Sequence, residues 1–124
     1  MVRAMYRLVL VGVIALAACT QTDNDRPATL EYVTEAILQP SCAQYDCHSS
    51  FARTKGYAFD TVAEAKQSLS RIVIPTDPDA SLLYIVLTRQ IKRMPYDSPL
   101  PDKDIALIRT WIVDGAPGLG LDIP

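Results

Sequence analysis

The chain has 124 residues, of which 49 % are hydrophobic and 21 % are charged, with 14 acidic and 12 basic side chains. This length suits one modest domain with a hydrophobic core of its own. The net charge of −2 argues against a nucleic-acid-binding protein, because such proteins need a strongly basic surface.

The first 18 residues have the layout of an export signal. Arg3 and Arg7 precede an apolar run, 8–18, which is too short to cross a bilayer as a helix, since that takes roughly 20 apolar residues. The run ends in the letters LAAC, which resemble the lipobox of bacterial lipoproteins, whose cysteine is lipidated. We therefore expect residues 1–18 to be a lipoprotein signal peptide and Cys19 to carry the lipid. The alternative is an ordinary secretory signal with an incidental cysteine.

Residues 19–28 are polar, lack apolar periodicity and include Pro27, which predicts a flexible tether before a domain at 29–124. Lipoproteins with aspartate after the lipidated cysteine tend to stay at the inner membrane, whereas this chain has Thr20. The resemblance therefore implies an exported, lipid-anchored protein. Its expected location is the periplasmic face of the outer membrane rather than the inner membrane, in a host that has an outer membrane.

The first helix of the domain is predicted to begin after Thr29, whose hydroxyl can cap it, and to stop at Pro40. Its expected buried face consists of Leu30, Val33, Ala36 and Ile37. The helix would deliver the chain directly to Cys42. The segment 49–60 shows no clear period, so we expect a loop there.

Two further helices are predicted in the middle of the chain. Thr61 and Glu64 have the spacing of a capping box, and the apolar residues that follow share one stripe: Val62, Ala65, Leu69 and Ile72. The next helix is expected to begin at Asp77, with Pro78 in its first turn. The letters LLYIVL within it also suit a strand, but the start signals favour a helix.

The last helix has the clearest signals. Pro101 can begin it, acidic residues occupy its first turn, and Gly115 with Pro117 ends it. Its predicted apolar face is Ile105, Ile108, Trp111 and Ile112. With no repeats and no alternating strands, the sequence predicts a small all-α domain of about four helices joined by long loops.

The letters PSCAQYDCHSS hold two of the three cysteines and the only histidine, as Cys42, Cys47 and His48. A thioether from Cys47 to a haem would place the next side chain where an imidazole can bind iron. The usual motif has two residues between the cysteines, whereas this chain has four. A Cys42–Cys47 disulfide in an oxidising compartment and another metal site are the alternatives.

Met94 is the only methionine beyond the predicted signal peptide. A lone methionine is usually a filler of the hydrophobic core. Met94, however, lies in the polar, proline-rich letters KRMPYDSPLP, outside any apolar period. It therefore becomes the candidate for a second iron ligand, because a partner histidine is not available within this chain.

The letters ILQPSCAQYDCHSS, DPDASLLYIVL and MPYDSPLPDKDIALIRTWIVDGAPG, in this order, resemble the small monohaem c-type cytochrome domains of bacteria, close to the class I cytochrome c fold. The resemblance covers nearly all of 29–124 and implies a haem c attached to Cys42 and Cys47. It also implies His48 as the proximal ligand of the iron and Met94 as the distal one. Trp111 would pack near the haem without a chemical role.

The implied function is that of an electron carrier for redox partner proteins in a periplasmic chain, and not that of an enzyme. With both axial positions held by protein, no coordination position is left for a substrate. The basic residues Arg89, Lys92 and Arg93 could pair with haem propionates or an acidic partner, or simply form a solvated helix end.

Two other functions stay open at this stage. The first is a structural or interaction lipoprotein without haem, stabilised by a Cys42–Cys47 disulfide. The second is a copper-binding protein that uses the same cysteines with His48 and Met94, since soft ligands suit Cu(I). Blue-copper sites usually need two histidines, and this chain has one.

Overall fold

A long N-terminal helix begins the domain in the computed structural model, which describes residues 25–121. It consists of α2 (Leu30–Tyr32), a π-helical part η2 (Val33–Leu38) and α3 (Gln39–Cys42), which follow one another without a break. The Thr29 hydroxyl accepts a hydrogen bond from the Tyr32 amide, as the capping prediction requires. Cys19 and the predicted signal peptide lie outside the described residues.

Pro40 does not stop this helix, so that prediction was wrong. The Gln39 amide donates to the carbonyl of Thr34, five residues earlier, which is the wider π-type turn. We attribute the passage of the helix through Pro40 to this widening, because a proline ring clashes with the preceding turn of a regular α-helix. The wider turn also rotates the buried face, so that Thr34 and Leu38 are buried while Ala36 is exposed.

The second helix, α4, spans Val62–Leu69 and confirms the capping-box prediction at its start. The Thr61 hydroxyl accepts a hydrogen bond from the Glu64 amide at 3.2 Å. Ile72, predicted as part of the helical stripe, lies instead in the turn that follows, where its carbonyl accepts from the Leu83 amide at 3.1 Å. The loop before α4 contains one short 3-10 turn, η3 (Thr54–Gly56).

The third helix, α5, spans Leu82–Thr88, so the helix prediction is confirmed but its start at Asp77 was wrong. Asp77 caps a separate turn, in which its carboxylate accepts from the Ala80 amide at 3.0 Å. The Ser81 hydroxyl donates to the Asp77 carbonyl and accepts from the Ile74 amide. These bonds hold Ser81 in extended backbone, which separates the turn from the helix.

The last helix, α6, spans Asp102–Val113 and follows Pro101 as predicted. Its four predicted apolar residues are all buried, and Trp111 is fully so. The Trp111 indole donates to the Pro117 carbonyl at 3.1 Å, which ties the helix to the segment that ends it.

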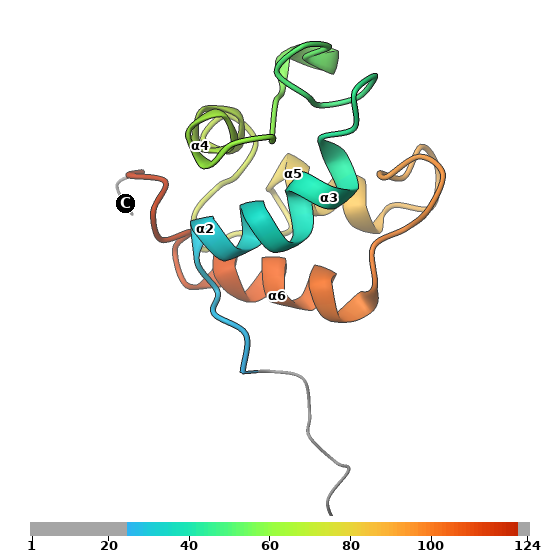
Figure 1. The fold of residues 1–124 in the computed structure, drawn as a ribbon. Coiled ribbons are helices and arrows are strands. Elements are labelled where there is room, and N and C mark those ends of the chain that lie inside the picture. The colour runs from blue at the N-terminus through green and yellow to red at the C-terminus, as the bar shows by residue number, and fades with distance from the viewer. Residues whose placement is uncertain (1–24, 122–124) are drawn as a thin grey trace, which may run out of the picture.

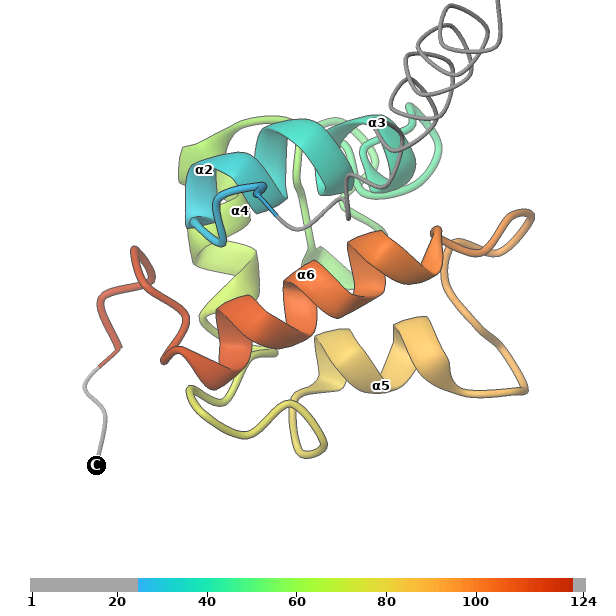
Figure 2. The ribbon, with the colours of Figure 1, turned by 90° about the horizontal axis from the view of Figure 1, so that it is seen from below.

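The described residues form four helices and no strand. Figures 1 and 2 show the N-terminal helix crossing α6, with α5 lying alongside α6. Gly118 brings the C-terminal segment against the N-terminal helix at φ +95°, where a Cβ atom would lie 2.8 Å from that of Leu30. Only glycine fits such a close approach.

The described part of the predicted tether, 25–28, contacts the domain. The Arg26 guanidinium forms an ion pair with Asp104 at 2.5 Å and donates to the Lys103 carbonyl at 2.9 Å.

Within 25–121, no helix has the length and apolar character needed to cross a bilayer.

Candidate functional site

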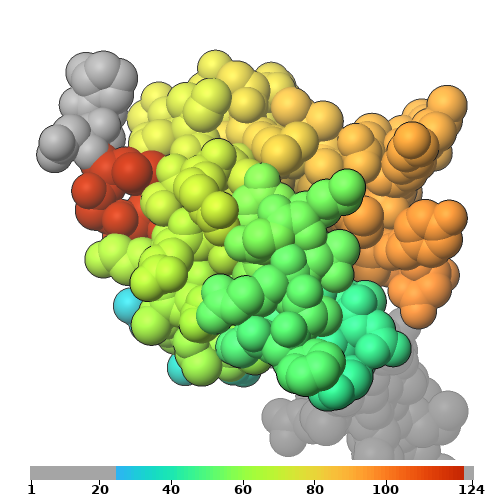
Figure 3. Space-filling model, turned by 90° about the horizontal axis from the view of Figure 1, so that it is seen from above, coloured from blue at the N-terminus to red at the C-terminus, as the bar shows by residue number. Residues whose placement is uncertain are grey.

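A cavity of about 270 Å³ lies between the turn that follows α3 and the face of α5. Figure 3 shows the side of the molecule where the green segment around residue 50 and the orange segment around residue 95 are both exposed. The cavity is lined by Cys42, His48, Lys55, Tyr57, Phe59, Ile72, Leu82, Leu83, Val86, Leu87, Arg89 and Met94. Most of these side chains are apolar, so the cavity suits a hydrophobic ligand.

His48 is held at this cavity by the backbone on both sides of it. Its amide donates to the Cys42 carbonyl at 3.1 Å, which closes the turn directly after α3. Its carbonyl accepts from the Phe59 amide at 2.9 Å, and the Phe59 ring stands edge-on to the imidazole at 5.4 Å between centroids. The histidine is therefore positioned by residues both earlier and later in the chain.

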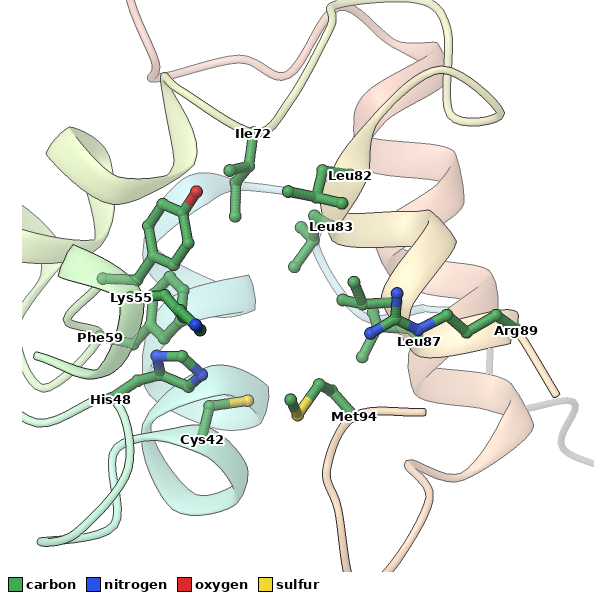
Figure 4. A pocket seen from close by; sticks show the side chains of 12 residues that line it. Cys42, His48, Lys55, Phe59, Ile72, Leu82, Leu83, Leu87, Arg89 and Met94 are labelled. Carbon is green, nitrogen blue, oxygen red and sulfur yellow. The ribbon is translucent and has the colours of Figure 1, made fainter. Parts of the chain in front are cut away.

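The imidazole has an unusual hydrogen-bonding state. Its Nδ1 atom is buried and has no hydrogen-bond partner among the described residues. An unpaired buried polar atom costs about 1–3 kcal/mol. Arg26 Nε and Thr34 Oγ1 are the other such atoms among the described residues, and neither of those residues lines the cavity. Figure 4 shows the ring directed into the cavity, beside the sulfur of Cys42.

The two cysteines of the motif lie in different surroundings, and both are free thiols. Cys42, the last residue of α3, lines the cavity, and burial raises the pKa of its thiol to about 12. Cys47 is exposed and is not among the lining residues. A disulfide between them, the alternative interpretation, is not formed in this structure.

Met94 reaches the same cavity from the opposite wall. Its amide donates to the Val86 carbonyl at 2.8 Å, and the Arg93 side chain donates to the Leu87 carbonyl at 2.8 Å. These bonds fix the loop after α5 to the helix itself. Figure 4 shows the Met94 thioether and the His48 imidazole facing the cavity from its two sides, with Cys42 between them.

The structure thus brings together three of the four predicted haem residues, Cys42, His48 and Met94, and leaves Cys47 at the surface. Trp111 is in the core and does not line the cavity. Within residues 25–121, no three His, Cys, Asp or Glu side chains gather into a group that could hold a metal ion. A metal at this cavity would therefore depend on ligands of mixed type.

Several lining residues were not identified from the sequence. Phe59 and Lys55 lie in the segment expected to be an irregular loop, where no period marks the residues that turn inward. Among the basic residues after α5, Arg89 lines the cavity, whereas Lys92 and Arg93 do not. The long-range bond from the Phe59 amide to His48 has no signature in the sequence.

Comparisons of the chain with protein-family models, with curated proteins and with solved structures gave no match. The functional assignment therefore depends on the cavity and on the side chains that line it.

Proposed function

We propose that this protein is a lipid-anchored periplasmic electron carrier with one covalently attached haem c, which resembles a small c-type cytochrome. The observation that carries the proposal is that Cys42, His48 and Met94 line one apolar cavity from opposite walls. His48 is the only histidine of the chain, and Met94 is the only methionine after the predicted signal peptide. An incidental disulfide loop gives no reason for these three to meet.

Each residue has a definite role under this proposal. Cys42 and Cys47 would attach the group through thioethers, and His48 and Met94 would be the axial ligands. When bound, the haem supplies one-electron transfer through the ferrous and ferric states of its iron. Because Cys47 is exposed, its side chain has to turn inward for attachment. The turn from Cys42 to His48 is held by backbone hydrogen bonds from the His48 amide to the Cys42 carbonyl and from the Cys47 amide to the Gln44 carbonyl, so attachment at Cys47 would require part of this turn to rearrange.

The surroundings suit a carrier better than a catalyst. Under this proposal both His48 and Met94 would bind the iron, and a haem held in this way would supply electron transfer rather than a binding position for a substrate. The thioether of Met94 is neutral and soft, which favours ferrous iron and raises the reduction potential relative to a second histidine. Apolar side chains from α5 would exclude water from the ligands.

The size of the cavity limits how a haem can fit into it. The cavity of about 270 Å³ is slightly smaller than typical ligand sites, which measure roughly 300–1,000 Å³. A group as large as haem would therefore extend through the open side of the cavity or move its walls apart. Redox partner proteins would then exchange electrons at an edge that is not covered by the domain.

Residues 19–124, which are the tether and the domain, are made in a host with c-type maturation, and their absorption spectrum and their mass after denaturation test this proposal. We expect sharp reduced-minus-oxidised bands and a mass raised by one haem. The Cys42→Ala/Cys47→Ala variant, made in the same host, is the control and should lose the added mass. A colourless folded protein whose mass shows two hydrogens lost would replace the proposal with the disulfide-stabilised lipoprotein.

A further inference from the structure

Two cationic side chains interrupt the apolar lining of the cavity. Lys55 comes from the η3 turn and Arg89 caps the C-terminus of α5, so they belong to opposite walls. Figure 4 shows the ammonium and the guanidinium directed toward the space between these walls. None of the lining residues is acidic.

Neither cation has a carboxylate partner within residues 25–121. The ion pairs found there are Arg26 with Asp104 and Arg53 with Glu64. Lys55 is exposed and Arg89 is half-buried, and the apolar lining offers neither an opposite charge, so together the two cations favour an anionic ligand at this cavity. A ligand with an apolar body and two anionic groups would supply that charge to both.

The backbone holds the Arg89 guanidinium in place before any ligand arrives, whereas at Lys55 the backbone conformation fixes only the course of the main chain. The Arg89 Nε atom donates to the Lys92 carbonyl at 2.7 Å, which leaves the two terminal nitrogens of the guanidinium for another partner. Lys55 has φ +58°, a left-handed conformation that costs a non-glycine residue of the order of 1–3 kcal/mol.

The turn that carries Lys55 is anchored on two sides. The Thr54 amide donates to the Cys47 carbonyl at 3.1 Å, and the Arg71 guanidinium donates to the Gly56 carbonyl at 2.6 Å. Lys55 is thus connected through the backbone to the cysteine–histidine turn, whereas Arg89 is connected to the Met94 loop.

We propose that Lys55 and Arg89 bind the two carboxylates of the ligand in this cavity, one from each wall. The inference rests on the proposed function, under which these carboxylates are the haem propionates. The inference gives Lys55 a function. It also gives Arg89 a function that its basic neighbours Lys92 and Arg93 do not share. The pair would orient the ligand, with its carboxylates toward the open side and its apolar edge toward Phe59 and Leu83.

The test is the pH dependence of the reduction midpoint of the haem-loaded domain, in which propionate ionisation appears as a transition. A nearby cation favours the ionised carboxylate, so its removal raises the propionate pKa. Lys55→Gln and Arg89→Gln should each move the transition upward by roughly 0.5–1 pH unit, about 3- to 10-fold in proton affinity.

Lys92→Gln is the matched control, because it removes the same charge from a residue that does not line the cavity. Its transition should stay where the wild-type transition lies, and Arg89→Lys, which keeps the charge, should retain most of the wild-type profile. Haem-loaded Lys55→Gln and Arg89→Gln proteins with the wild-type profile would overturn this inference alone. A wild-type chain that takes up no haem would overturn the proposed function, and this inference with it.

Discussion

The hydrophobic core and the cavity are built from the same kinds of residue, but only the core is closed. Around α6, Ile108, Trp111 and Ile112 have no exposed surface. At the cavity, Leu82 of α5 keeps 43 % of its surface exposed, and Val86 beside it is half-buried. Apolar surface left open costs about 25 cal/mol per Å², so the cavity is the part of this domain that a hydrophobic ligand would complete.

The largest loss of stability is expected for a substitution in the closed core. Trp111→Ala should lower the free energy of unfolding by about 3–5 kcal/mol, because it empties a fully packed site and breaks the bond to Pro117. Leu82→Ala at the cavity should cost less than about 1 kcal/mol in protein made without haem, since its side chain is already half open. Urea unfolding of the two variants measures both values, and equal losses would contradict the distinction.

The two cysteines should differ strongly in reactivity in protein made without haem. At pH 8, a thiol with a pKa of about 12 is ionised to about one part in ten thousand, and burial also restricts access to Cys42. We expect iodoacetamide to modify the exposed Cys47 at least about 100-fold faster, as followed by peptide mass. Similar rates would show that the Cys42 side of the cavity opens readily.

Loss of the methionine ligand should shift the redox equilibrium of the haem-loaded protein. Met94→Ala removes the thioether that favours ferrous iron, so the midpoint should fall by at least ~59 mV, which is tenfold for one electron. Redox titration measures the change. An unchanged midpoint would remove Met94 from the ligand set.

The smallest expected effect concerns the loop beside the cavity. Hydrogen bonds from the Ser50 amide and hydroxyl hold the pKa of Asp60 below its usual value. A carboxyl with a lowered pKa in the folded state stabilises the protein above its unfolded pKa, and this stabilisation is lost as the pH falls below about 4. Asp60→Asn should therefore be slightly less stable than wild type at pH 7, and the difference should narrow in acid. A difference independent of pH would exclude the ionised carboxylate as its cause.

The helices were predicted correctly where capping residues and apolar spacing determine them. The predictions failed where hydrogen bonds of another kind change the course of the chain. The caps at Thr29 and Thr61 and the apolar face of α6 follow from spacing alone. The passage of the first helix through Pro40 depends on a π-type turn, and the late start of α5 depends on the bonds of Ser81. Neither leaves a periodic pattern in the sequence.

The candidate site also has residues that could be predicted from the sequence and residues that could not. Cys42, His48 and Met94 could be singled out by residue type and position in the sequence, and the structure places them around one cavity. The exposure of Cys47 and the inward position of Lys55 could not be predicted. Both depend on how an irregular loop folds against segments distant in sequence, and no local rule determines that.

The most direct test of the central claim is the proton NMR spectrum of the reduced haem-loaded domain beside that of Met94→Ala. If His48 and Met94 bind the iron from opposite sides, the Met94 methyl group lies over the porphyrin face, where the ring current moves its resonance far upfield. We expect that resonance in the wild type and its absence in the variant. A haem-loaded wild type without any upfield methionine resonance would contradict the account.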